Sequence, residues 1–115
     1  MRTLNDYFLY GNIPDISTAD QVYIPVPDAG RIIKIMSVID GAISGADATL
    51  TAKIGGTAVT GGAITVANSG SAAGDVDSCA PTALNSVVEG DAIEIETDGG
   101  STGTVKVDIT VIVRR

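Results

Sequence analysis

Five of the side chains in residues 87–100, VVEGDAIEIETDGG, are carboxylates: Glu89, Asp91, Glu94, Glu96 and Asp98. On a strand, Glu94 and Glu96 lie on one face, roughly 6.5–7 Å apart along the chain, and that spacing would suit a glycosidase pair. Ile93 and Ile95 must then point to the core, so both glutamates face water. Because a general acid needs a desolvated carboxyl with a raised pKa, the pattern favours a solvated strand face, partly paired with Lys106. Glu89-Gly90-Asp91 is typical of a turn whose carboxylates accept turn N–H groups.

The remaining candidates for chemistry are few. Asp75 and Asp77 alternate in a stretch rich in Gly and Ser, but a Ca²⁺ site takes roughly six to eight oxygen ligands, so turn chemistry is favoured and a metal stays open. The chain has no histidine, which excludes histidine general bases and Ser-His-Asp triads. Without a histidine to activate it, Cys79 is expected to be a small buried hydrophobe. We therefore expect no enzyme and no cofactor.

Composition limits the partners. The chain has 115 residues, which fits one domain, and its charge is −7 with seven scattered basic residues. A nucleic-acid reader needs a basic face and an anionic membrane would repel this charge, so we expect no nucleic acid and no membrane partner. With no Trp and one Phe, the core must consist of small, branched side chains. High Gly, Thr and Val content points to strands and tight turns.

The first twenty residues, MRTLNDYFLYGNIPDISTAD, differ from the rest because they hold Tyr7, Phe8 and Tyr10, three of the four aromatic residues. We predict an extended N-terminal arm over residues 1–20, not a core strand, and a β-sandwich domain over residues 21–115. Two alternatives stay open for the aromatic cluster. The arm folds back over one end of its own domain, or it docks on a neighbouring chain.

Alternation from residue 21 onward predicts the strands. QVYIPVP places Val22, Ile24 and Val26 on one side, and its prolines indicate an edge strand or a strand start. Residues 31–39, RIIKIMSVI, are apolar at both odd-numbered and even-numbered positions, so we expect this strand to be covered on both sides. Residues 49–54 turn Leu50, Ala52 and Ile54 inward. Gly55-Gly56 then supplies the positive φ values of a two-residue hairpin turn, before Ile64 and Val66 point inward again.

The second half is predicted as one long connection and one hairpin. Residues 68–86 are small and turn-rich, with room for one short strand near residues 82–84. The final hairpin pairs Ile93 and Ile95 with a nine-residue alternating run, residues 105–113, and it would place Lys106 opposite Glu94 or Glu96. About seven or eight short strands with Gly-rich turns indicate a sandwich or barrel. We expect an all-β, antiparallel, jelly-roll-like sandwich.

Four segments carry a family resemblance: IPVPDAGRIIK, GADATLTAKIGG, VVEGDAIEIETDGGST and the closing VDITVIV. Together they resemble the capsid decoration, or cement, proteins of tailed bacteriophages over about residues 22 to 113. The resemblance implies a compact β domain that trimerises on the outer capsid surface and bridges neighbouring capsomers. It therefore implies a virion location, the major capsid protein as a partner, self-association as a homotrimer, and no active site.

This resemblance turns two segments into candidate contacts. The arm would grip the capsid or an adjacent subunit through Leu4, Tyr7, Phe8, Tyr10 and Ile13. The two-sided strand would form the trimer interface through Ile32, Lys34, Met36 and Val38. Deleting residues 1–20 would then leave the domain folded but abolish capsid binding. The alternatives are a phage head-fibre or tail component, a receptor-binding module, and a non-viral sugar-binding or adhesin domain.

Overall fold

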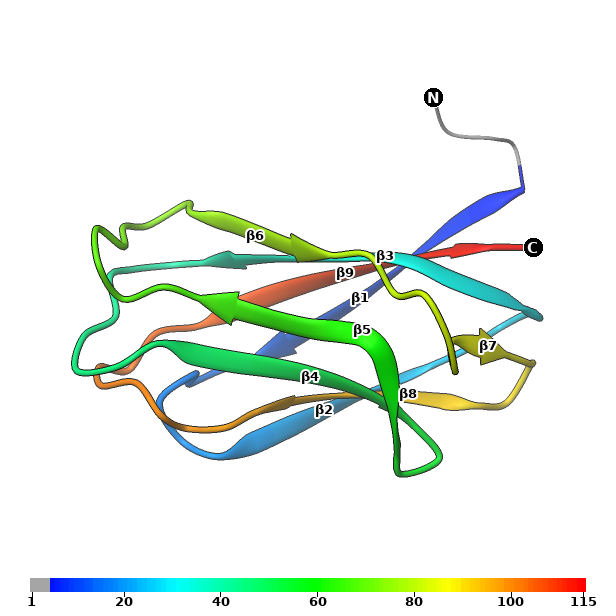
Figure 1. The fold of residues 1–115 in the computed structure, drawn as a ribbon, viewed down its shortest axis with the longest axis horizontal. Helices are drawn as coiled ribbons and strands as arrows, with labels where there is room; N and C mark the ends of the chain where they lie inside the picture. Colours follow the sequence, from blue (N-terminus) through cyan, green and yellow to red (C-terminus); the bar gives the residue numbers. More distant parts are fainter. Residues whose placement is uncertain (1–4) are drawn as a thin grey trace.

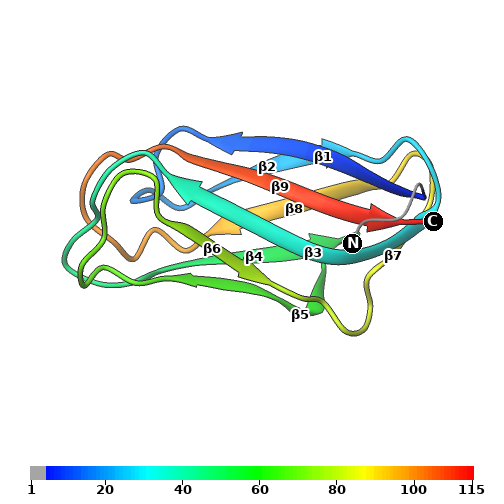
Figure 2. The same cartoon turned by 90° about the horizontal axis from the view of Figure 1, so that it is seen from above.

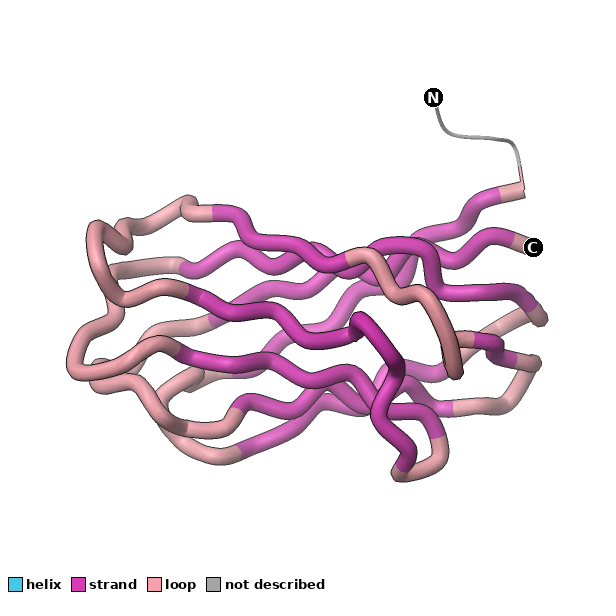
Figure 3. Tube along the Cα trace, viewed as in Figure 1, coloured by secondary structure: helices cyan, strands magenta, loops and turns pink. Residues whose placement is uncertain are grey.

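Nine strands form the regular structure of the protein in a computed structural model that describes residues 5–115 (Figure 3). They are β1 (Asp6–Ile13), β2 (Asp20–Pro25), β3 (Gly30–Ile39), β4 (Ala48–Ile54), β5 (Thr57–Val66), β6 (Val76–Cys79), β7 (Ser86–Val87), β8 (Ala92–Thr97) and β9 (Val107–Arg114). Residues 5–115 contain no helix long and apolar enough to cross a membrane.

The strands form two antiparallel sheets packed face to face (Figures 1 and 2). The first sheet has the order β1-β9-β3-β6, with the short β7 also paired to β3, and the second has the order β2-β8-β4-β5. Most connections cross from one sheet to the other; the β4–β5 hairpin stays within its sheet. This is the strand order of a jelly roll, so the prediction of an antiparallel jelly-roll-like sandwich is confirmed.

The core lies between the sheets and consists of isoleucine, valine, leucine and alanine side chains. Ile24 and Val26, Leu50 and Ala52, Ile64 and Val66, Ile93 and Ile95, and the odd-numbered residues of 105–113 are all buried, as predicted. Val22 and Ile54 are partly buried against them. The predicted hairpin turn is also confirmed, because Gly55 and Gly56 have φ values of 59° and 82°.

The N-terminal segment departs from the prediction. Residues 6–13 are extended, but they pair with β9 along their whole length as an edge strand of the first sheet. The expectation of an arm that is not part of the sandwich is therefore wrong for Asp6–Ile13. Ile13 and Ile16 are fully buried, and the amide of Ile16 donates to the carbonyl of Val105 at 2.8 Å. Residues 6–16 thus pack on their own domain, which agrees with the first of the two alternatives, although they join the edge of a sheet and do not fold over one end.

The predicted final hairpin is wrong. β8 pairs with β2 and β4 in the second sheet, while β9 pairs with β1 and β3 in the first. Residues 98–106 carry the chain across the sandwich (Figure 1). Lys106 is therefore not opposite Glu94 or Glu96. Its Nζ lies 3.8 Å from Oδ2 of Asp108. In residues 68–86, the structure adds β6, and residues 82–84 form only an isolated bridge from Ala83 to Thr60.

Candidate docking face

A β-bulge in β3 decides which side chains reach the surface. The register of β3 with β9 shifts between Ile32 and Lys34. Even-numbered residues therefore point inward before the bulge, and odd-numbered residues point inward after it. Ile32 is 0% exposed, and Ile35 and Ile39 are buried on the same side. The expectation that Ile32 contributes to a trimer interface is therefore wrong, because the bulge turns it into the core. Lys34, Met36 and Val38 point outward and are half-buried.

A buried asparagine supports this bulge. The side chain of Asn85 donates from Nδ2 to the carbonyl of Ile32 at 2.7 Å. The amide of Ile32 donates in turn to the carbonyl of Asn85 at 2.9 Å. These two bonds satisfy the backbone N–H and C=O of Ile32 on the edge of β3 that faces away from β9, where the pairing of Gly30 and Arg31 with β7 ends. Asn85 therefore holds the backbone of β3 directly before the bulge.

β1 places two of its aromatic side chains outward. Phe8 is 58% exposed and Tyr10 is 64% exposed, whereas Ile13 is 0% exposed and belongs to the core. The expectation that Ile13 contacts a partner is therefore wrong. Tyr7 points the other way and packs against the core, with the guanidinium of Arg115 5.3 Å from its ring centroid. Leu4 lies outside the described residues.

A glycine allows β1 to lie close to the second sheet. Gly11 is buried, and a β carbon at this position would lie 2.7 Å from Cδ1 of Ile24. Any larger residue would push β1 away from β2 or force Ile24 to move. Gly11 thus positions the strand that carries Phe8 and Tyr10.

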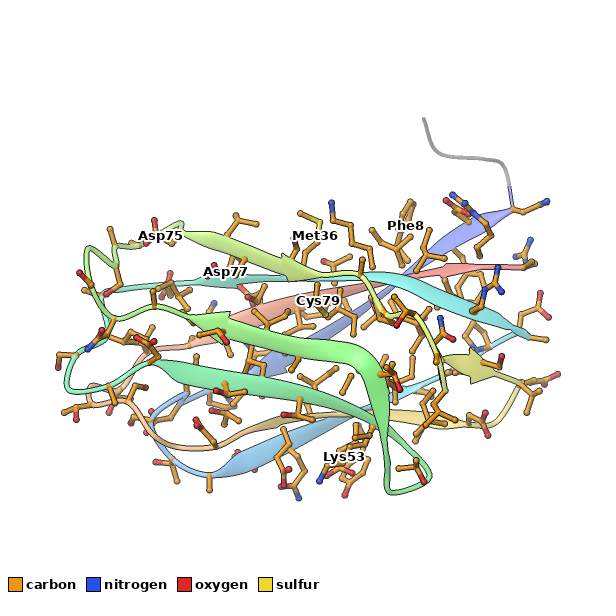
Figure 4. All side chains as sticks on the ribbon, viewed as in Figure 1. Phe8, Met36, Lys53, Asp75, Asp77 and Cys79 are labelled. Carbon is orange, nitrogen blue, oxygen red and sulfur yellow. The ribbon has the colours of Figure 1, made fainter. Side chains whose placement is uncertain are left out.

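The register of the first sheet gathers the outward side chains into rows. Phe8, Ile112 and Lys34 form one row. Tyr10, Thr110, Met36 and Ser78 form the next, followed by Asn12, Asp108, Val38 and Val76. The apolar and aromatic residues of these three rows are Phe8, Tyr10, Met36, Val38, Val76 and Ile112. We call this set the apolar face. Figure 4 shows Phe8 and Met36 on one side of the sandwich and Lys53 on the opposite side.

The apolar face is only partly covered. Ile112 is 2% exposed although it points away from the core, and its register neighbours are Phe8 and Lys34. Val76, which lies beside Val38 on β6, is exposed. A shallow hollow of about 190 Å³ lies over β3, β6 and β9. It is lined by Met36, Ser37, Val38, Val76, Asp108 and Thr110.

A polar cluster holds Tyr10 at the margin of this face. The carboxylate of Asp108 accepts hydrogen bonds from the Tyr10 hydroxyl and, at 2.9 Å, from Nδ2 of Asn12. The hydrogen bond from Tyr10, then that from Asn12, lowers the pKa of Asp108 below its ordinary value, and the charge of Lys106 acts in the same direction. The same bond to Asp108 raises the pKa of Tyr10. The ring of Tyr10 is thus fixed in place although it is exposed.

The outer face of the second sheet is polar by comparison. Tyr23 and Glu94 face each other on β2 and β8, and Lys53 on β4 is the register partner of Glu94. The Lys53 ammonium lies 2.9 Å from Oε1 of Glu96, and this hydrogen bond is the main reason that the pKa of Lys53 is raised. The glutamates are therefore on a solvated face, as predicted, but their cationic neighbour is Lys53 and not Lys106.

Two of the three other carboxylates of the opening motif, Asp91 and Asp98, accept hydrogen bonds from backbone amides, whereas Glu89 accepts none within residues 5–115. Asp91 accepts from the amide of Val88 at 3.0 Å, and Asp98 accepts from the amide of Gly100 at 3.0 Å. Asp75 likewise accepts from the amide of Ala72 at 2.9 Å, which is the turn chemistry expected there. No group of three His, Cys, Asp or Glu residues within residues 5–115 is placed to hold a metal. Burial raises the pKa of the partly buried Cys79 thiol.

The structure thus joins two sets of residues that the sequence separated. Phe8 and Tyr10, expected on an arm, share one face with Lys34, Met36 and Val38, expected at a trimer interface. Val76 is not predicted as a contact residue because it lies in a segment interpreted as a connection. Ile112 is not predicted either, although an isoleucine at an outward position of VDITVIVR breaks the alternation and marks a covered outer face.

Comparison with known proteins gives structural matches alone. No protein-family model matches the sequence, and no curated protein matches it. A chain in the acidic stable capsid structure of Helicobacter pylori bacteriophage KHP30 is similar, with a TM-score of 0.62, 9% identity, and coverage of 96% of this chain and 87% of that chain. A chain of the cyanophage Pam1 capsid asymmetric unit has a TM-score of 0.60 and 18% identity, covering 96% and 84%. At these identities the likeness establishes that this chain shares its fold with chains of two phage capsids.

Proposed function

We propose that this protein is a virion structural protein that binds the outer surface of a phage capsid as a homotrimer and stabilises the head. One observation carries the proposal. An outward-facing apolar surface lies on a jelly-roll sandwich that resembles chains of two phage capsids over 96% of its own length. Because 87% and 84% of those chains are covered as well, each of them is a small chain of similar length and not a large protein with one matching domain.

The chemistry of the apolar face suits a protein partner. Contiguous exposed apolar patches are uncommon on monomers and often mark interaction sites. Aromatic residues and methionine, which are enriched at interfaces, are represented here by Phe8, Tyr10 and Met36. The sheet beneath them is regular and hydrogen-bonded, so little conformational freedom is lost on binding. Many copies on one shell would add avidity to a modest single contact.

One face is expected to serve one partner. A stable interface buries about 800 Å² on each side, which is comparable to the whole outer side of a four-stranded sheet. The capsid contact proposed for Phe8 and Tyr10 and the trimer contact proposed for Lys34, Met36 and Val38 would therefore compete for the same surface. We assign this surface to the capsid, and the subunit contacts of the trimer to the edges and ends of the sandwich.

The copy number of this chain in purified virions, relative to the major capsid protein, tests the proposal. Quantitative mass spectrometry is expected to find near-stoichiometric amounts, as a protein that covers the shell requires. A few copies per particle would instead identify a head fibre, tail component or receptor-binding module. Absence from the particles would refute a virion role. Sedimentation of the purified chain tests the trimer separately, since a monomer at every concentration would contradict it.

A further inference from the structure

We propose that the partner surface that meets the apolar face is acidic, with carboxylates placed to receive cations at the margin of that face. This inference rests on the proposed function and deepens it, because it states the chemistry of the capsid surface that the protein recognises. Charge distribution, the pairing of the cations and the character of the opposite face carry it.

Charge is distributed unevenly between the outer side of the first sheet and the rest of the chain. The register places Arg31 and Arg114 in one row with Asp6, and it places Lys34 beside Ile112. Lys106 reaches Asp108 on the same side. Asp40 lies opposite Lys106, where its amide donates to the Lys106 carbonyl at 3.0 Å. These four cations and the carboxylates of Asp6, Asp40 and Asp108 give this side a net charge of +1, whereas the two other cations and eleven other carboxylates of residues 5–115 give −9.

The cations on this side differ in whether they have an internal partner. Arg114 is held by Asp6, with Nε 2.8 Å from Oδ1 and Nη2 3.1 Å from Oδ2. Lys34 and Arg31 make no ion pair or side-chain hydrogen bond within residues 5–115. On the opposite face, by contrast, Lys53 is paired with Glu96. The two unpaired cations of the strands are therefore both on the side that carries the apolar face.

Docking changes the electrostatic situation of Lys34. Its side chain lies in the same row as Phe8 and Ile112, so a partner that covers the apolar face also removes water from the ammonium. A desolvated charge without a counter-charge is strongly destabilising, whereas a carboxylate on the partner would offset the lost hydration and fix the register of docking. The geometry therefore favours an acidic partner surface over a neutral one.

Two other occupants fit less well. The same face of a second copy would bring two surfaces of net charge +1 together, as a twofold interface repeats one patch on both subunits. A nucleic acid would meet Asp6 and Asp108 among the cations, on a chain whose overall charge is −7. An acidic protein surface with apolar contacts at its centre matches both the charge and the side chains of this face.

Rebinding of the purified chain to capsids stripped of it tests the inference. Five proteins are compared: the wild type, Lys34→Gln, Lys34→Glu, Lys34→Arg, and the matched control Lys53→Gln on the opposite face. Each is first shown by circular dichroism and thermal melting to be folded. Wild-type binding is expected to weaken steadily between about 50 and about 500 mM salt, because salt screens the attraction between exposed charges. At low salt, Lys34→Gln should weaken binding about threefold to tenfold, and Lys34→Glu about tenfold or more.

The control separates this inference from the proposed function. Lys53→Gln should bind as the wild type does, and Lys34→Arg should restore binding because it keeps the charge. If the wild type binds capsids but salt has no effect, or if Lys34→Gln and Lys53→Gln behave alike, the acidic partner is wrong and the virion role stands. If the wild type binds no capsid at any salt concentration, both proposals fall. If Lys34→Gln changes the sedimentation of the free chain, the occupant is a second copy, which also refutes the inference.

Discussion

Phe8 and Tyr10 keep more than half of their surface in water although the chain has only four aromatic residues. A chain that needed them for stability would place them in the core, where an aromatic side chain contributes most. Here the core consists of small branched residues, and Tyr10 is instead fixed at the surface through Asp108. At the residue scale, this use of aromatic rings favours recognition over stability.

Replacement of Phe8 by alanine tests this directly. Phe8 and Tyr23 are 58% and 59% exposed on opposite faces of the sandwich, so Tyr23→Ala is a matched control. Both variants are expected to melt close to the wild type. Phe8→Ala should weaken capsid rebinding by about 1–2 kcal/mol, as truncation of an interface aromatic typically does, and Tyr23→Ala should leave it unchanged. Equal effects of the two variants would remove the apolar face from the contact.

Leu84 offers a second test at this scale. It is the one non-glycine residue with positive φ in residues 5–115, at 53°, and its side chain is exposed. A left-handed conformation costs an L-residue about 1–2 kcal/mol, and glycine avoids most of that cost at an entropic penalty of roughly 0.5–1 kcal/mol. Leu84→Gly is therefore expected to raise the free energy of unfolding by about 0.5–1 kcal/mol in urea titrations. The control Val88→Gly, at an exposed position with ordinary φ, should lower it; a similar loss in Leu84→Gly would contradict the argument.

Asp108 gives a prediction for pH. Its pKa is lowered below 3.8 in the folded protein, chiefly by the hydrogen bond from Tyr10, so its stabilising contribution is present above that value and is lost as pH falls through the lowered pKa. Thermal midpoints of the wild type and of Asp108→Asn should differ at about pH 6 and converge toward about pH 3. A difference that stays constant over this range would mean that the charge of Asp108 contributes nothing.

At the element scale, the bulge in β3 decides which residues form the apolar face. Alternation alone places Ile32 with Lys34, Met36 and Val38, and the extra residue at the bulge separates Ile32 from them. Asn85, more than fifty residues further along the chain, holds this irregularity through two hydrogen bonds to Ile32. A short-range pattern cannot reveal a bulge whose support comes from so far away.

Asn85→Asp is the sharpest change at this scale. The variant keeps the size of the side chain but replaces the Nδ2 donor with an oxygen that faces the carbonyl of Ile32. Loss of a buried hydrogen bond costs about 1–3 kcal/mol, and more for a charged group. Chemical denaturation should show at least that loss, whereas Asn68→Asp, at a turn residue whose side chain makes no hydrogen bond in residues 5–115, should change little. An unaltered Asn85→Asp would mean that the bulge does not depend on this side chain.

Alternation predicted the inward residues of most strands but not their arrangement. The odd-numbered residues of 105–113 and the pair Ile93 and Ile95 are buried as expected, because a half-buried strand must alternate. Alternation does not reveal which sheet a strand belongs to, because a half-buried strand has the same pattern in either sheet. The predicted pairing of β8 with β9 is wrong for this reason. β1 was not recognised as a strand because its outward positions carry aromatic rings and its buried position 11 carries a glycine.

At the scale of the whole molecule, the two sides of the sandwich have different characters. The outer side of the first sheet combines the apolar face with a net charge of +1, while the outer side of the second presents Tyr23, the paired Lys53 and two glutamates. The glutamates that first raised the question of catalysis thus belong to the solvated side. We expect a protein of this kind to lie on its partner in one orientation.

Deletion of residues 1–20 is now expected to unfold the protein instead of only abolishing binding. The deletion removes β1 and the buried side chains of Ile13 and Ile16. Loss of one buried isoleucine side chain costs about 2–5 kcal/mol, and domains are stable by only about 5–15 kcal/mol. Circular dichroism of the truncated chain should show no cooperative melting transition. A well-folded truncated protein would restore the interpretation of residues 1–20 as a separable arm.

The position of β9 in the first sheet has a consequence for biosynthesis. β9 is the last strand of the chain, yet it lies between β1 and β3, which bond to it and not to each other. Until β9 has left the ribosome, β1 has no strand partner in this sheet, and β3 can pair only with β6 and β7. The side that is proposed to meet the capsid is therefore completed only once residues 107–114 have been translated. A chain terminated before β9 does not present this side as a continuous sheet, so we expect that it cannot replace the finished protein on the capsid.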